Sequence, residues 1–282
     1  MNSAAESRGS ASAVDDHSIR TGTMGWSYED WRGPFYAVGQ AMNRTLEEYA
    51  KVFDTVELDT TFFGTPRPST LESWARQVPP DFLFSAKVPK AVTHERRLLG
   101  AVEFALDFGG LVRDKLGERL GCLLLQLPPD FSTGERAVLD TFVDGVNDPR
   151  GAPGLPWVIE FRHASWAGTS VAADLEAQGI AVATTERLDV GGRLRYVRLL
   201  GDQGSVKRFD ERAFDRSEDL AAWAERLSAA CAERQNDPSV PPILVYVRNF
   251  FEGHAPATIL DLRARLGLPV PTPPGQQQMS LF

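Results

Sequence analysis

Charged side chains stand at the ends of short apolar runs along this chain, and their types suit proton transfer and anion binding. Glu57 and Asp59 close one run, Lys87 closes the next and Glu160 closes a later one. A carboxylate can move a proton, while lysine and arginine side chains hold the oxygens of an anionic group. The sequence therefore predicts acid-base chemistry on a substrate that carries phosphate or carboxylate.

The candidate residues fall into two groups. The catalytic candidates are Glu57, Asp59, Lys87, Glu160 and His163. The substrate-binding candidates, which would hold an anion or stack on a ring, are Trp26, Tyr28, His94, Gln126, Arg162, Trp166, Arg198, Asn249 and His254. The alternative is that Glu57, Glu160, Lys87 and Arg162 only pair with one another as a buried ring of charges. We favour function, because buried charge is costly unless it is used or fully paired.

A divalent metal is a further candidate cofactor. Glu57, Glu160, His163, Glu252 and His254 carry suitable ligand atoms, but their positions match no recognised ligand spacing. The sequence has no glycine-rich nucleotide motif, serine nucleophile elbow or paired-cysteine motif. The cofactor is therefore left open.

Eight β-like runs must position these side chains. They span residues 21–25, 55–59, 82–88, 120–127, 157–162, 180–185, 194–200 and 243–249. Helical patterns follow at 45–53, 69–77, 98–115, 134–146, 171–178, 217–233 and 257–266. The connection 185–194 is short and glycine-rich, so we expect no helix there. Eight alternating units with strands apolar on both faces predict an α/β fold, a single (β/α)8 TIM-type barrel, with its active site at the carboxyl ends of the strands.

The barrel is expected to occupy residues 20–267, between a disordered leader at 1–19 and a disordered Pro/Gln-rich tail at 268–282. No apolar run approaches the roughly 20 residues of a membrane helix, and the leader lacks the apolar stretch of a signal peptide. We therefore expect a cytoplasmic protein with no membrane partner. A net charge of −8 and a pI near 5.1 argue against a surface that binds duplex DNA unaided.

The last five residues resemble the peptide by which bacterial replication and repair proteins bind the DNA sliding clamp. Their order is Gln278-Met279-Ser280-Leu281-Phe282. An exposed Leu-Phe pair on a polar tether would need a partner. The resemblance implies docking through Gln278, Met279, Leu281 and Phe282, and the alternative is a frayed terminus.

The body resembles the YecE-like family, known as domain of unknown function 72. The motifs that carry the resemblance are Gly22-Thr23-Met24-Gly25-Trp26-Ser27-Tyr28, Val56-Glu57-Leu58-Asp59, Phe84-Ser85-Ala86-Lys87-Val88-Pro89, Leu125-Gln126-Leu127-Pro128-Pro129, Glu160-Phe161-Arg162-His163, Tyr196-Val197-Arg198-Leu199 and Glu252-Gly253-His254-Ala255-Pro256. The resemblance implies a (β/α)8 barrel and names no activity. Two positions depart from the family pattern: Asp59 and Arg248 stand where asparagines are expected.

Three functional hypotheses follow. The first is a DNA-maintenance enzyme that acts on a phosphodiester or a damaged nucleotide and is recruited to the sliding clamp by its tail. This hypothesis agrees with the family's architectural similarity to metal-dependent endonuclease barrels. The second is a small-molecule hydrolase, lyase or isomerase for an anionic metabolite. The third is a non-catalytic barrel that binds a ligand.

Overall fold

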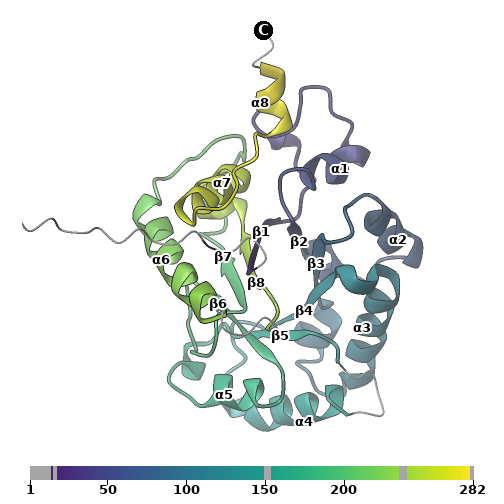
Figure 1. Cartoon of the computed structure of the whole chain (residues 1–282). Helices are drawn as coiled ribbons and strands as arrows, with labels where there is room; N and C mark the ends of the chain where they lie inside the picture. Colours follow the sequence, from purple (N-terminus) through teal and green to yellow (C-terminus); the bar gives the residue numbers. More distant parts are fainter. Residues whose placement is uncertain (1–13, 15–17, 149–153, 235–239, 280–282) are drawn as a thin grey trace, which may run out of the picture.

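The computed structural model describes residues 14, 18–148, 154–234 and 240–279, and it confirms the predicted barrel. Eight parallel strands close in the order of the sequence, each paired with the next and β1 paired with β8 (Figure 1). The strands are β1 (Ile19–Met24), β2 (Thr55–Leu58), β3 (Leu83–Lys87), β4 (Leu120–Gln126), β5 (Trp157–Glu160), β6 (Ala181–Thr185), β7 (Tyr196–Leu199) and β8 (Ile243–Val247). All eight predicted runs are strands.

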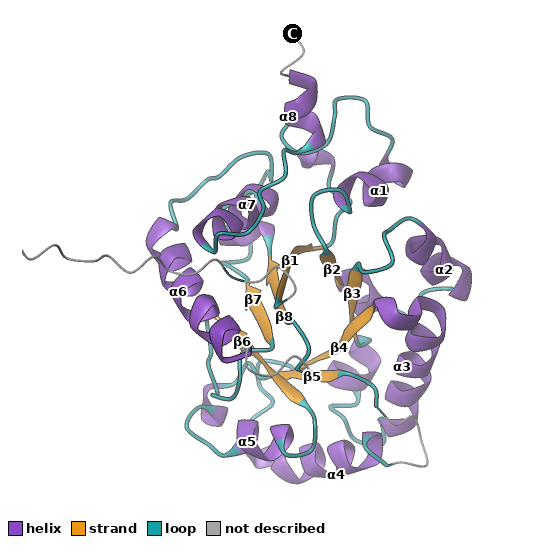
Figure 2. Ribbon diagram, in the orientation of Figure 1, coloured by secondary structure: helices purple, strands orange, loops and turns teal. Residues whose placement is uncertain are grey.

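Helices surround the barrel on its outside, as Figure 2 shows. They are α1 (Thr45–Tyr49), α2 (Pro68–Arg76), α3 (Val102–Leu116), α4 (Arg136–Val146), α5 (Val171–Glu176), α6 (Ser217–Arg234), α7 (Ala255–Arg265) and α8 (Pro274–Met279). The first seven match the seven predicted helical patterns. The connection between β6 and β7 contains no helix, as predicted from its glycines.

The start predicted for α3 at residue 98 is wrong. Arg97 and Leu98 have positive φ angles of 49° and 68°, so neither residue can continue a right-handed helix. Leu98 is instead buried in the core, and the helix begins only at Val102, after Gly100. The apolar pattern correctly indicates that Leu98 is buried, but Leu98 lies in a loop and not in a helical turn.

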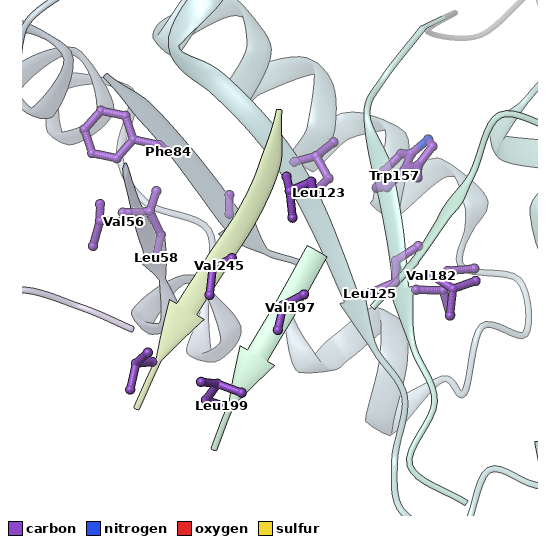
Figure 3. Close-up of a cluster of buried hydrophobic side chains, with 14 of the residues drawn as sticks. Val56, Leu58, Phe84, Leu123, Leu125, Trp157, Val182, Val197, Leu199 and Val245 are labelled. Carbon is purple, nitrogen blue, oxygen red and sulfur yellow. The ribbon is translucent and has the colours of Figure 1, made fainter. Parts of the chain in front are cut away.

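Two apolar layers stabilise the fold. Strand side chains that point outward pack beneath the helices and include Val56, Leu58, Phe84, Leu123, Leu125, Trp157, Val182, Val197, Leu199 and Val245 (Figure 3). Alternate side chains on the same strands point into the barrel, where Leu124, Val158, Tyr196 and Tyr246 form a smaller cluster. Because side chains alternate along a strand, the same strands fill both layers.

The tail is only partly as expected. Pro274–Met279 forms the short helix α8, and the Gly275 N–H donates to the carbonyl of Phe35 at 2.8 Å. The Val38 N–H donates to Oε1 of Gln278, also at 2.8 Å. A side chain at position 275 would lie 2.1 Å from the carbonyl oxygen of Gly33, so this close approach requires glycine. The expected disorder is therefore wrong for this part of the tail, whereas Leu281 and Phe282 lie outside the described residues.

None of the helices in the described part of the chain has both the length and the apolar character to span a membrane.

Candidate active site at the mouth of the barrel

A polar layer closes the barrel interior at the carboxyl ends of the strands, which we call the mouth. Its members are the last inward-facing side chains of five strands: Glu57, Lys87, Gln126, Glu160 and Arg198. Parallel strands bring these ends to one side of the barrel, as the sequence predicted. All five side chains are buried.

Arg198 joins two carboxylates across the mouth. Its Nε and Nη2 bind the two oxygens of Glu57 at 2.9 and 2.7 Å, and its Nη1 binds Oε2 of Glu160. Burial favours the neutral guanidine, but the two carboxylates outweigh burial and hold the pKa of Arg198 well above its usual value. We call this set the Arg198 triad.

Each carboxylate of the Arg198 triad has one further donor. The hydroxyl of Tyr196 donates to Glu57 at 2.7 Å, and Nε2 of Gln126 donates to Glu160 at 2.7 Å. Exposure is 2% for Arg198, 0% for Glu57 and 1% for Glu160. The triad is therefore a fully paired floor beneath the mouth, and the predicted anion ligand Arg198 is already bound to carboxylates.

Lys87 and Asp59 form a second, more open pair. Lys87 Nζ lies 3.3 Å from Oδ1 of Asp59, whose side chain is 37% exposed, and 4.1 Å from the centre of the Phe62 ring. Burial raises the pKa of Asp59, but Lys87, Arg198 and Arg248 outweigh burial and bring it below the usual value. Burial lowers the pKa of Lys87 despite the attraction of Asp59. Asp59 is thus an ionised carboxylate within reach of solvent.

Two arginines at the mouth have no carboxylate partner among the residues that the structure describes. Arg162 lies two residues after the end of β5, and Arg248 directly follows β8. Burial, Arg187, Arg198 and Arg248 lower the pKa of Arg162 more than Glu160 raises it. Arg162 is therefore repelled by other cations on the same side of the barrel. Arg248 lies over the Phe250 ring at 4.9 Å.

His94 faces the same cations from the loop after β3. Its Nδ1 lies 2.8 Å from the Thr93 hydroxyl, and its ring meets the Phe62 ring edge-on at 4.9 Å. Burial, Lys87 and Arg162 lower the pKa of His94 below its usual value. His94 is therefore largely neutral at pH 7.

Trp26 and Tyr28 line the rim above β1. The Trp26 ring meets Trp74 at 5.4 Å, and the Tyr28 hydroxyl donates to the Met24 carbonyl at 2.7 Å. Burial and Asp59 raise the pKa of Tyr28 to about 12, so it stays a neutral phenol at the mouth.

The remaining candidates form hydrogen bonds with other residues of the protein. Asn249 accepts from Trp31 Nε1 and from the Ala255 N–H, and Trp166 Nε1 donates to the Phe131 carbonyl. His254 Nδ1 lies 2.7 Å from the Phe209 carbonyl oxygen, and His163 Nδ1 accepts from the Ser165 N–H. Asn249, Trp166 and His254 are buried, so the geometry gives these three a positioning role in the loops.

The metal candidates do not converge. Within the described ranges, no group of three or more His, Cys, Asp or Glu side chains could hold a metal ion. Glu57 and Glu160 bind Arg198, while Glu252 accepts from the Thr258 hydroxyl and pairs with Arg212. The residues present therefore do not fit a metal centre of this kind.

A cavity of about 590 Å³ lies at the opposite end of the barrel. It is lined by residues at the amino ends of the strands, such as Gly121, Trp157 and Ala181. Its most prominent carboxylate, Glu176, already accepts from the Arg193 N–H. We place the candidate site at the mouth and not here, because the mouth gathers the titratable groups.

Comparison with known proteins agrees with this architecture. The family described as protein of unknown function DUF72 matches residues 20–279. The chain belongs to the DUF72 family. This match includes all of α8, so the docked helix lies within the DUF72 region.

Named relatives are similar to this chain in sequence, and solved structures share its fold. The chain is 32% identical to protein YecE of Escherichia coli over 147 residues, 51% of this chain and 48% of YecE. It is 26% identical to protein YunF of Bacillus subtilis over 155 residues, 52% of each chain. The chain thus spans about half the length of the curated relatives it matches. A DUF72 structure from Thermotoga maritima superposes with a TM-score of 0.70 at 24% identity, over 89% of this chain and 100% of that one. One from Enterococcus faecalis gives 0.63 at 19%, over 90% and 99%.

Phe62 and Tyr246 were not among the site residues predicted from the sequence. Phe62 contacts both Lys87 and His94, and the Tyr246 hydroxyl bonds Thr55 and Ser85 inside the barrel at 2.6 and 2.8 Å. The signal that could have pointed to Phe62 is an aromatic residue four positions after the end of β2 at Leu58.

Proposed function

We propose that the mouth binds phosphate groups of a DNA substrate and that the protein is a DNA-maintenance enzyme acting on a phosphodiester or a damaged nucleotide. The observation that carries this proposal is the pair Arg162 and Arg248, two cations at the mouth that form no ion pair in the described chain, although Glu160 acts on Arg162 and Arg248 acts on Asp59 electrostatically. Unpaired guanidinium groups beside a lysine are suited to phosphate oxygens, which they bind in pairs.

The chemistry assigned to each group follows from its exposure. Arg162, Arg248 and Lys87 would orient phosphate oxygens and stabilise the charge that develops on them. Asp59 is the carboxylate that can meet a substrate, because Glu57 and Glu160 are buried against Arg198. The Arg198 triad would hold the floor of the site in place.

Anion binding can be tested with sulfate, inorganic phosphate and a single-stranded oligonucleotide, using calorimetry. Arg162→Met and Arg248→Met are expected to weaken the binding of each probe by about tenfold, the loss of one charge-assisted contact. Arg119→Met is the matched control, since Arg119 lies before the amino end of β4 and donates to the Pro79 carbonyl. Equal binding by all four proteins would refute the anion site.

Recruitment to the sliding clamp is the second part of the proposal. It is supported by the C-terminal sequence, in which Leu281 and Phe282 stand two and three positions after Met279, the last residue of α8. Tethering would raise the local concentration of DNA around an acidic protein. The Leu281→Ala/Phe282→Ala variant is a cleaner test than a deletion from Gln278, because Gln278 holds α8 through Val38. Micromolar clamp binding lost in this variant is expected, and binding that persists would refute docking through this peptide.

A small-molecule hydrolase, lyase or isomerase is the second candidate, with an anionic metabolite as substrate. One observation favours it: Gly275 and Gln278 bind the enzyme's own residues 33–38, which reduces the free tail. A metabolite carrying phosphate or carboxylate that co-purifies with the protein and is displaced by sulfate would support this candidate. If ligand binding persists with every substrate tested but no product forms, a non-catalytic barrel is the better description.

A further inference from the structure

We propose that His94 takes up a proton when a dianion occupies the mouth, so that anion binding at this site is linked to pH. The inference rests on the anion site proposed above and adds a fourth group to it. His94 would bind the anion as an imidazolium, which carries its positive charge only while the anion is bound.

Two contacts fix the His94 ring beside the cations. Nδ1 lies 2.8 Å from the Thr93 hydroxyl, so Nε2 is the nitrogen left for a ligand. The Phe62 ring contacts His94 on one side, at 4.9 Å between centroids, and carries Lys87 Nζ at 4.1 Å from its own centroid. Phe62 therefore holds the imidazole and the ammonium group in one cluster without pairing them.

The backbone around His94 is held in an uncommon conformation. Residues Ala91–Glu95 form a π-helical turn, and Arg97 and Leu98 follow with positive φ angles. Arg97 is anchored to the loop after β4, with Nη1 2.9 Å from Asp130 Oδ1 and Nη2 2.6 Å from Glu135 Oε2. Strained, non-glycine backbone persists where surrounding contacts determine it, and such turns are frequent at functional sites.

The charges that face His94 come from every loop around it. Lys87 approaches from β3, Arg162 from the segment after β5 and Arg97 from its own loop, and all three disfavour the imidazolium. Asp130, a carboxylate from the loop after β4, favours it. Burial adds to the effect of the cations and keeps the pKa of His94 below its usual value in the free protein.

A bound dianion reverses this balance. Two negative charges between Lys87 and Arg162 cancel the repulsion and offer Nε2 a hydrogen-bond acceptor, so the pKa of His94 rises on binding. By linkage, the anion binds more tightly below that raised pKa than above it. A rise of about one pH unit corresponds to about tenfold tighter binding in acid.

The test uses the full chain with sulfate, which stays a dianion across the whole range studied. The imidazole Cε1–H resonances are followed by NMR from about pH 5 to about pH 8, with and without sulfate, and His94→Gln assigns the relevant signal. The midpoint of His94 is expected to move to higher pH with sulfate. His254 is the internal reference, because it is buried against Phe209 and its signal should not move.

Calorimetry provides the second measurement. Sulfate affinity of the unmodified protein is expected to increase about tenfold between pH 7.5 and pH 5.5, and that of His94→Gln to change by less than about twofold. One outcome would overturn this inference and leave the anion site intact. In that outcome Arg162→Met loses sulfate binding, but sulfate does not move the His94 midpoint of the unmodified protein. No sulfate binding, or binding insensitive to Arg162→Met, would overturn both.

Discussion

Replacing Arg198 with methionine would leave two buried carboxylates without their cation. Glu57 would lose two hydrogen bonds and Glu160 one, and neither side chain is more than 1% exposed. Breaking a buried pair by removing one partner costs about 3–5 kcal/mol. Because two carboxylates are orphaned here while Tyr196 and Gln126 still donate to them, we expect a loss of about 4–5 kcal/mol. That is a large share of the roughly 5–15 kcal/mol that stabilises a typical domain.

Urea denaturation at pH 7.5 and pH 5.0 measures this loss. The deficit is expected to shrink toward pH 5.0, because a proton taken up by either orphaned carboxylate removes an uncompensated charge. Glu57→Gln and Glu160→Gln, added together to Arg198→Met, should recover more than half of the deficit.

The matched control is Arg265→Met. Arg265 pairs with Asp261 one helical turn earlier on α7, at 2.9 Å and partly exposed, so its removal should cost at most about 0.5 kcal/mol. A loss below about 1 kcal/mol for Arg198→Met, equal at both pH values, would refute the claim that the triad is a paired floor.

Three further predictions concern the loops and helices. Gly275→Ala should release α8, because its Cβ would meet the Gly33 carbonyl oxygen at 2.1 Å; amide exchange at Val38, bonded to Gln278, should speed up roughly fivefold or more, and unchanged exchange would contradict the docking. Gly110→Ala, in α3 with nothing within 4 Å of the added Cβ, should stabilise the protein by about 0.5–1 kcal/mol in the same denaturation assay, and a loss would mean that the helix face is occupied. The lowered pKa of His94 means that the unfolded chain binds its proton more readily, so stability should fall as pH decreases through about 6.5; His94→Gln should show a smaller drop in Tm between pH 7.5 and pH 5.5, and an equal drop would refute the lowered pKa.

The position of the mouth was predictable from local features of the sequence. Lys87 and Glu160 end their strands, and Glu57 and Arg198 stand one residue before a strand end. Side chains at the carboxyl ends of parallel strands must share one side of a closed sheet. The strand runs were predictable for the same reason, because strands buried on both faces are apolar almost throughout. The predicted start of α3 is four residues too early, because the apolar residue Leu98 is buried in a loop and not in the helix.

The pairing of charges across the mouth was not predictable from local features. Arg198 is 141 residues from Glu57 and 38 from Glu160, and only closure of the barrel brings the three together. The alternative of a buried ring was partly correct, since both glutamates are paired, but with Arg198 and not with Lys87 or Arg162. The sequence offers no signal for which cation pairs with the two glutamates. Alternation along a strand predicts which side chains face inward, but it does not predict which side chains of other strands they contact.

The sequence by itself determined the eight strands and the seven helices α1 to α7, their closure into a barrel and the end at which polar side chains collect, since alternation and apolar runs are local properties. Only the tertiary structure decided that Arg198 is fully paired, that Arg162 and Arg248 have no carboxylate partner in the described chain, and that α8 docks on residues 33–38. Those outcomes depend on distances between segments far apart in the chain, and such distances are fixed by packing rather than by local propensity.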